Sequence, residues 1–211
     1  MKGDVIATAP ATGFSPEVFG RVANKYSRFR PQYPAALFEY LSSLCTDRRC
    51  ALDCATGNGQ AARGLVNFFS QVVALDASTN QLASRIQNDR LSYVAAHAET
   101  LPIRDKSVDL ILVAQALHWF NFDRFYENVR RVVVPGGVLA ATCYHWTHVS
   151  PEVDAVRHHF HQTVVKPYWT PERRHVDEMY KTIPFPFDEV VAPVFTMEMS
   201  WTMNDLLGYF E

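Results

Sequence analysis

The sequence predicts an α/β fold with a doubly wound, mostly parallel sheet and flanking helices. The stretch Leu52 to Gln60, LDCATGNGQ, follows a short apolar run and precedes a helical pattern, as a strand–loop–helix corner does. A second strand, Val72 to Asp76, follows it along the chain. Val108 to Ala114 is nearly all apolar after Asp109, which is typical of a parallel strand covered on both faces.

The corner at Leu52 to Gln60 organises the rest of the chain. Asp53 closes the strand, and Gly57 and Gly59 allow the backbone to turn tightly and to approach a ligand closely. Ligands in open α/β sheets bind at the carboxyl ends of the strands, near the point where strand order reverses. We therefore expect a cofactor site at this corner.

Two helices are expected before the corner, after a flexible tail at residues 1–13. Ser15, Pro16 and Glu17 supply a capping hydroxyl, a proline in the first turn and an acid at the positive end of the helix dipole. The apolar stripe of this helix comprises Phe14, Val18, Val22, Tyr26 and Phe29. The second helix is marked by Leu37, Leu41 and Leu44.

Further strands and helices complete the predicted core, which spans residues 14–143. Ser78 is expected to cap a helix that carries Leu82 and Ile86 on one face. The remaining strands are Ser92 to Ala95, Val108 to Ala114 and Val138 to Cys143. Between the last two, a helix begins at Phe122 and stops at Pro135-Gly136-Gly137.

Beyond Tyr144 the pattern changes, and residues 144–190 are predicted to be an inserted helical lid that roofs the substrate pocket. Its main helix carries Val153, Val156, Phe160 and Val164 on one face. Phe195 to Trp201 alternates like a strand, and a last helix carries Leu206, Leu207 and Phe210. Residues 14–211 are thus expected to form one domain.

The corner does not match the phosphate-binding loops. Ala62 replaces the third glycine of G-x-G-x-x-G, and no lysine follows as in a P-loop. The Asp53 carboxylate would repel a pyrophosphate, but it suits a cofactor with an ammonium group, such as S-adenosylmethionine. Asp76 stands where a ribose hydroxyl pair is held. A nicotinamide dehydrogenase is an alternative that these features disfavour.

Five motifs in order resemble those of class I S-adenosylmethionine-dependent methyltransferases. They are LDCATGNGQ, VVALDAS, AHAETLP (Ala96 to Pro102), VDLILVAQALHWF (Val108 to Phe120) and VVPGGVLAAT (Val133 to Thr142). Within that class the chain is similar to the small-molecule branch, methyltransferase type 11, with its trans-aconitate-type and ubiquinone/menaquinone-type enzymes. The resemblance implies a Rossmann-like fold and covers about Phe14 to Thr142.

The resemblance also implies where cofactor and acceptor bind. The implied cofactor-binding residues are Tyr26, Arg30, Asp53, Ala55, Thr56, Gly57, Gly59, Asp76, Ala77, Ser78, Ala98, Glu99 and Gln115. Many relatives have an aspartate where this chain has His97, so we assign the adenine contact to the Ala98 amide and the Glu99 side chain. The substrate pocket is expected to be lined by Tyr33, Trp119, Phe120 and Trp146.

Relatives usually continue through another strand that pairs with the sheet, and this C-terminal strand is missing from the predicted elements. Either the chain is a truncated form with an exposed sheet edge, or a partner covers the gap. A homodimer through the C-terminal edge is one such arrangement.

These features predict transfer of a methyl group to a small-molecule acceptor, at oxygen, including a carboxylate, or at carbon. For a hydroxyl or a carbon acid, His118 is the first candidate base and His145 the second, because imidazole titrates near neutral pH. A carboxylate acceptor needs no base, and a structural role for His118 stays open. The alternative from another class is a non-catalytic cofactor-binding protein with an interaction role.

The composition disfavours several other classes. A net charge of −2 lacks the basic footprint of a nucleic-acid-binding protein. No apolar run approaches the roughly 20 residues of a membrane span, and the start lacks the apolar core of a signal peptide. A cytoplasmic protein with four reduced cysteines is therefore expected. His158 and His161 share a predicted helix face, but no nearby acid or cysteine completes a metal site.

Overall fold

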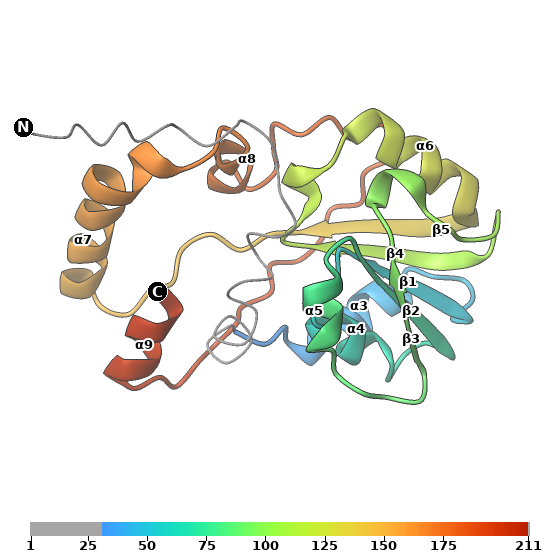
Figure 1. Cartoon of the computed structure of the whole chain (residues 1–211), viewed down its shortest axis with the longest axis horizontal. Coiled ribbons are helices and arrows are strands. Elements are labelled where there is room, and N and C mark those ends of the chain that lie inside the picture. Colours follow the sequence, from blue (N-terminus) through green and yellow to red (C-terminus); the bar gives the residue numbers. More distant parts are fainter. Residues whose placement is uncertain (1–30, 211) are drawn as a thin grey trace, which may run out of the picture.

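The computed structural model describes residues 31–210, so the predicted N-terminal helix, with Tyr26, and Arg30 lie outside the described residues. One five-stranded parallel sheet forms the centre of the fold (Figure 1). The strands are β1 (Cys50–Cys54), β2 (Gln71–Asp76), β3 (Leu91–Ala95), β4 (Val108–Ala114) and β5 (Val133–Thr142). Their order is β3-β2-β1-β4-β5, which reverses between β1 and β4 and confirms the predicted doubly wound sheet.

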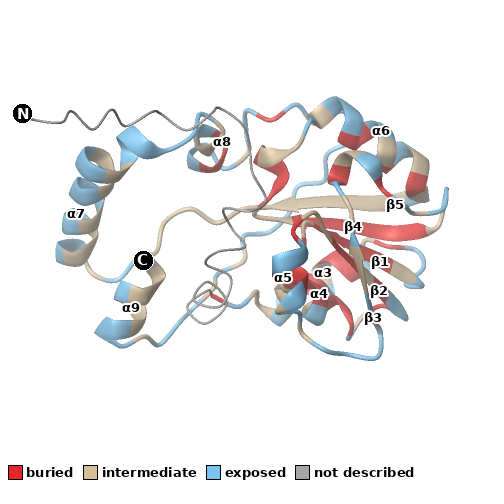
Figure 2. Cartoon of the chain, viewed as in Figure 1, coloured by how far each residue is buried: buried red, intermediate tan, exposed pale blue. Residues whose placement is uncertain are grey.

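The two faces of the sheet are covered by different helices, because successive strand residues point to opposite faces. Leu52 and Cys54 belong to the apolar cluster that includes α6 (Phe122–Val132). Ala51 belongs to the cluster on the other face, which includes α3 (Ala35–Ser43) and α4 (Gln60–Leu65). Burial on both faces explains why the central strands are nearly all apolar, and Figure 2 shows the buried residues gathered around the sheet.

Two of the predicted element boundaries are wrong. Ser78 caps α5 (Thr79–Ala83) as expected, but the helix ends before Ile86, whose backbone N–H donates to the Asn58 carbonyl at 2.9 Å. β5 begins at Val133, directly after α6, so Pro135-Gly136-Gly137 lies inside a strand. A shift in the pairing of β4 with β5 between Val108 and Leu110 accommodates this irregular stretch.

Residues 151–177 form α7 (Pro151–Phe160), a π-helical turn (His161–Val165), a 3₁₀ turn (Lys166–Tyr168) and α8 (Arg173–Asp177). The predicted apolar stripe of α7 is present, but Val156, Phe160 and Val164 are exposed. Figure 1 shows α7 standing apart from the sheet, whereas α8 contacts η2 (Leu117–Trp119), the 3₁₀ turn that follows β4. The inserted segment therefore approaches the sheet through α8.

The predicted strand from Phe195 to Trp201 is wrong, because the structure has no regular element there. Phe187 packs against the α6 face and Phe195 against the α3 face, so the intervening chain crosses from one side of the sheet to the other. A chain that crosses the sheet in this way does not run beside an edge strand, so it cannot pair with one as a further strand. The last helix is α9 (Met203–Phe210), and none of the helices within residues 31–210 is long and apolar enough to cross a membrane.

Candidate functional site

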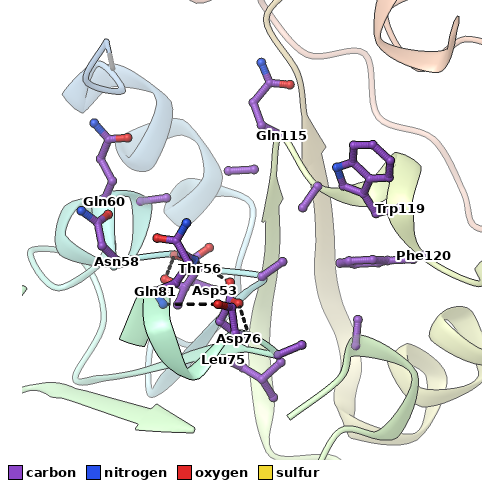
Figure 3. Close-up of a pocket in the computed structure, with 18 of the residues that line it drawn as sticks. Asp53, Thr56, Asn58, Gln60, Leu75, Asp76, Gln81, Gln115, Trp119 and Phe120 are labelled. Atoms are coloured by element: carbon purple, nitrogen blue, oxygen red, sulfur yellow. Dashed lines mark hydrogen bonds between the residues drawn. The ribbon is translucent and has the colours of Figure 1, made fainter. Parts of the chain in front are cut away.

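A pocket of about 210 Å³ lies at the carboxyl ends of the strands, where strand order reverses (Figure 3). It brings together most of the residues that the sequence singled out. These are Tyr33, Asp53, Ala55, Thr56, Gly57, Asp76, Ala77, Ser78, Ala98, Glu99, Gln115, Trp119 and Phe120. Trp119 and Phe120 lie on the other side of the pocket from Asp53 and Asp76.

The loop between β1 and α4 is shaped by three residues with left-handed backbone conformation. The φ angles of Ala55, Gly57 and Gly59 are 59°, 59° and 96°. Gly59 does not line the pocket itself, but a Cβ there would collide with the Tyr93 hydroxyl. The Thr56 N–H donates to the Leu75 carbonyl at 2.9 Å, which ties the loop to β2. The glycines are therefore required by backbone geometry and by close packing.

Asp53 is a fully buried carboxylate with one unpartnered oxygen. Its Oδ2 accepts from the Thr56 hydroxyl at 2.5 Å and from the Ala62 N–H at 2.8 Å. Its Oδ1 meets no hydrogen-bond donor within residues 31–210. Burial raises the pKa of Asp53 to about 6, although the two hydrogen bonds lower it. Because Asp53 lines the pocket, a ligand with a cationic donor would satisfy its free oxygen.

Asp76 closes β2 and fixes the loop from the other side. Its Oδ2 accepts from the Gly57 N–H at 2.8 Å, and its Oδ1 accepts from the Ser78 N–H at 2.7 Å. Burial raises the pKa of this carboxyl. A carboxylate oxygen accepts more than one hydrogen bond, so both oxygens remain able to receive a pair of ligand hydroxyls.

The side of the pocket away from Asp53 and Asp76 is built at the end of β4. Gln115 follows β4 with a φ of 58°, and its backbone N–H donates to the Thr142 carbonyl at 2.8 Å. Its side-chain amide donates to the Tyr144 carbonyl at 2.7 Å, so it connects the ends of β4 and β5. Trp119 and Phe120 then enter the pocket from η2.

Comparison with known proteins assigns the chain to a family. The methyltransferase domain family matches residues 52–141. A Dictyostelium discoideum protein named as a methyltransferase is 34% identical over 196 residues, covering 91% of this chain and 74% of the relative. A solved structure from Anaeromyxobacter dehalogenans, described as a type II methyltransferase, is 44% identical with a TM-score of 0.80, covering 86% of this chain and 77% of its own. This chain belongs to the S-adenosylmethionine-dependent methyltransferases.

The family membership confirms the predicted cofactor, and it rules against the dehydrogenase and the non-catalytic alternatives. A further relative of this methyltransferase, the malonyl-[acyl-carrier protein] O-methyltransferase of Pseudescherichia vulneris, is 34% identical over 128 residues. That match covers 59% of this chain, and the chain spans 51% of that enzyme.

The pocket of the methyltransferase fits S-adenosylmethionine. The free oxygen of Asp53 suits the α-ammonium group, and the Asp76 carboxylate suits the ribose hydroxyls. The Glu99 side chain, which we assigned to the adenine, uses Oε1 to accept from the Asn121 N–H at 2.9 Å. His97 also lines the pocket, beside the buried Ala98.

The structure does not bring His118, His145 or Trp146 into the pocket lining. The His118 Nδ1 lies 2.9 Å from the Tyr180 hydroxyl, and burial lowers the pKa of His118 to about 4. The His145 Nε2 lies 2.9 Å from Asp177 Oδ1. Both partners come from the inserted segment, so each imidazole is hydrogen-bonded outside the described pocket lining.

Trp146 packs among side chains of the inserted segment and does not line the described pocket. Its ring lies 4.6 Å from the His161 ring, and the Arg157 guanidinium lies 4.7 Å from its centre. The described pocket lining contains no residue after Tyr144, so the predicted lid does not contribute side chains to it. Within residues 31–210, no group of three or more histidine, cysteine or acidic side chains is placed to hold a metal ion.

Several lining residues were not predicted from the sequence. They are Asn58, Gln60, Ala61, Leu75, Gln81, Ala96, His97, Ala114, Ala116 and Tyr144. Asn58 lies in the glycine loop and Gln60 begins α4, and their position beside Gly57 and Gly59 was a usable signal. Tyr144 lies two residues after β5, so the rule that ligands bind at strand ends would have found it. Gln81 carried no such signal, because it lies inside α5.

We predict that Asp76→Ala weakens binding of S-adenosylhomocysteine at least tenfold in calorimetric titration. The variant removes the expected ribose acceptor and also leaves the Gly57 and Ser78 N–H groups without their partner. Asp105→Ala is the control, because Asp105 is exposed and pairs with Arg131 at 2.8 Å, outside the pocket lining. Unchanged affinity in a folded Asp76→Ala protein would contradict the assignment.

Proposed function

We propose that this methyltransferase methylates an oxygen of a small-molecule carboxylate. The observation that carries the proposal is that the side of the described pocket away from Asp53 and Asp76 carries no histidine, lysine or carboxylate that could act as a base. The side chains there are Tyr33, Gln115, Trp119, Phe120 and Tyr144. A carboxylate is already ionised at neutral pH, so it needs no base, unlike a hydroxyl or a carbon acid. The malonyl-[acyl-carrier protein] relative, whose name states an oxygen acceptor, supports the same choice.

The residues of this chain then act by binding, alignment and exclusion of water. When bound, S-adenosylmethionine supplies the methyl group on a positively charged sulfur. Asp53 would hold the α-ammonium group of the cofactor, and Asp76 would hold its ribose hydroxyl pair. Trp119 and Phe120 present aromatic faces, which attract a cation and keep water away from it. Alignment of the carboxylate with the methyl group accounts for much of the rate enhancement.

The proposed partners follow from the same features. A small-molecule acceptor fits the pocket, and the net charge of −2 gives no basic surface for nucleic acid. Among the described strands, β5 pairs only with β4, so its outer edge is the surface for the homodimer that we predicted.

The test is a screen of small mono- and dicarboxylic acids with S-adenosylmethionine labelled in its methyl group. We expect the label in the product to be released as methanol by mild alkali, because methyl esters hydrolyse under those conditions. We also expect kcat/KM to stay within about threefold from pH 6 to pH 9, since the acceptor carboxylate is ionised throughout that range. Acids with their carboxyl group replaced by an amide serve as controls. An alkali-stable label, or a rate that rises about tenfold per pH unit, would contradict a carboxylate acceptor.

A further inference from the structure

We propose that Tyr180 is a positioning residue for the acceptor side of the pocket. Its hydroxyl fixes the turn η2, and η2 carries Trp119 and Phe120 into the pocket. Tyr180 belongs to the inserted segment after α8 and does not line the pocket itself. The methyl acceptor is therefore received by a surface whose shape depends on a side chain about sixty positions further along the chain.

The Tyr180 hydroxyl holds η2 through a side chain of that turn. His118 Nδ1 lies 2.9 Å from the Tyr180 oxygen, within hydrogen-bond distance. A tyrosine hydroxyl can both donate and accept, so the bond forms with either neutral tautomer of His118. One hydroxyl thus fixes the ring next to Trp119.

The contact from His118 to the pocket is direct. The centre of the His118 ring lies 4.6 Å from the centre of the Trp119 ring and 5.8 Å from that of Tyr180. His118 is buried, and its turn η2 contacts α8. Because the His118 ring lies against both the Tyr180 ring and the Trp119 ring, a change in its orientation is expected to displace Trp119.

The backbone that presents Tyr180 is strained. Met179 and Tyr180 both have left-handed backbone conformation, with φ angles of 52° and 62°. This conformation is unfavourable for a residue other than glycine. Two successive residues of this kind persist only where surrounding contacts require them, and such strain collects at functional positions. The N–H of Tyr180 donates to the His175 carbonyl at 2.7 Å, which anchors the strained turn to α8.

Tyr180→Phe is the test, and Tyr126→Phe is its matched control. Both tyrosines are largely buried, and the Tyr126 hydroxyl donates to a carbonyl, that of Pro184, at 2.7 Å. Both variants lose one buried hydroxyl, but only Tyr180 bonds to η2. The proteins are labelled with 5-fluorotryptophan, and the Trp119 signal in the ¹⁹F NMR spectrum is assigned with Trp119→Phe.

We expect Tyr180→Phe to shift or broaden the Trp119 signal and Tyr126→Phe to leave it at its wild-type position. With any acceptor that the wild-type enzyme methylates, Tyr180→Phe should raise KM about tenfold, while the Kd for S-adenosylhomocysteine stays within threefold. The result does not depend on a carboxylate acceptor, so it can fail or succeed separately from the proposed function.

A wild-type Trp119 signal in Tyr180→Phe would overturn the proposal, and so would an equal shift in Tyr126→Phe. If Tyr180→Phe does not fold, His118→Leu gives the same test, because it removes the hydrogen-bond partner of the Tyr180 hydroxyl while leaving the tyrosine in place. His118→Leu should also displace the Trp119 signal, and an unchanged signal there would overturn the proposal as well.

Discussion

Asp53→Asn is expected to weaken binding of S-adenosylhomocysteine by roughly 30- to 150-fold, which corresponds to about 2–3 kcal/mol for a charge-assisted hydrogen bond. The free oxygen of Asp53 is the expected acceptor for the ammonium group of the cofactor. An asparagine keeps an oxygen for Thr56 and Ala62, but it places an uncharged NH₂ group at the free position. Calorimetric titration at pH 7.5 measures the change.

The same substitution is expected to stabilise the protein without ligand. Burial raises the pKa of Asp53 from 3.8 to about 6, so the folded state disfavours the ionised form. The wild-type stability that depends on Asp53 is therefore fully present below pH 3.8, is lost as the pH rises from 3.8 to about 6, and stays lost above pH 6. The loss is on the order of 3 kcal/mol, and Asp53→Asn avoids part of it. Urea unfolding at pH 7.5 should show a higher midpoint for the variant.

Asp109→Asn is the matched control for both measurements. Asp109 is also buried, and its Oδ1 has no hydrogen-bond partner, although the Arg49 guanidinium lies 3.8 Å away. Its Oδ2 accepts from the Arg49 and Cys50 N–H groups at 2.9 and 2.8 Å. It lies at the start of β4, away from the pocket, so its variant should bind the ligand within twofold of wild type. If Asp53→Asn binds as well as Asp109→Asn, the free oxygen of Asp53 does not meet the cofactor.

Gly59→Ala is expected to lower the free energy of unfolding by about 2–4 kcal/mol, from backbone strain together with overpacking. The φ of 96° is unfavourable for alanine, and the new Cβ collides with the Tyr93 hydroxyl. That hydroxyl is held by the Ile86 carbonyl at 2.8 Å, so it cannot move away without losing a hydrogen bond. Gly59 is also the residue before α4, so a displaced backbone there should weaken cofactor binding as well.

Gly57→Ala separates strain from collision. Gly57 has a φ of 59°, but its Cβ would lie 3.8 Å from the nearest atom, Gln81 Oε1, which is an ordinary contact. We expect a loss of about 1–2 kcal/mol there, from strain alone. The double variant Gly59→Ala/Tyr93→Phe should recover part of the loss seen in Gly59→Ala. Equal losses in Gly57→Ala and Gly59→Ala would show that the Tyr93 contact does not matter.

The central sheet was predictable because each strand carries its own signal. β4 is apolar on both faces, and β1 and β2 each carry an acid at or next to their last residue, beside the glycine loop. The strand predicted at Phe195 to Trp201 has the right alternation, but a strand also needs a neighbour with free hydrogen-bonding groups. No pattern within seven residues shows whether such a neighbour is present. Local periodicity is therefore reliable for strands at the centre of the sheet and unreliable near its edge.

The cofactor side of the pocket was predicted better than the acceptor side, for the same reason. The residues around Asp53 and Asp76 lie within two short segments, so their spacing in the sequence already describes their geometry. His118 and His145 are placed by Tyr180 and Asp177, which lie 62 and 32 positions away. A histidine with a distant partner looks the same in the sequence as a histidine that faces a ligand.

Ala55 and Gln115, which follow β1 and β4, both have left-handed backbone conformation. The two strand ends nevertheless differ in what they present to the pocket. On the β1 side, backbone N–H groups orient the two carboxylates, and most side chains could be exchanged without disturbing that framework. On the β4 side, we expect the side chains of one short turn to determine which acceptor is bound. A few substitutions in that turn are therefore expected to change the acceptor while the binding of S-adenosylmethionine is kept. Directed evolution toward a new acceptor should begin at Trp119 and Phe120 and leave the β1 side untouched.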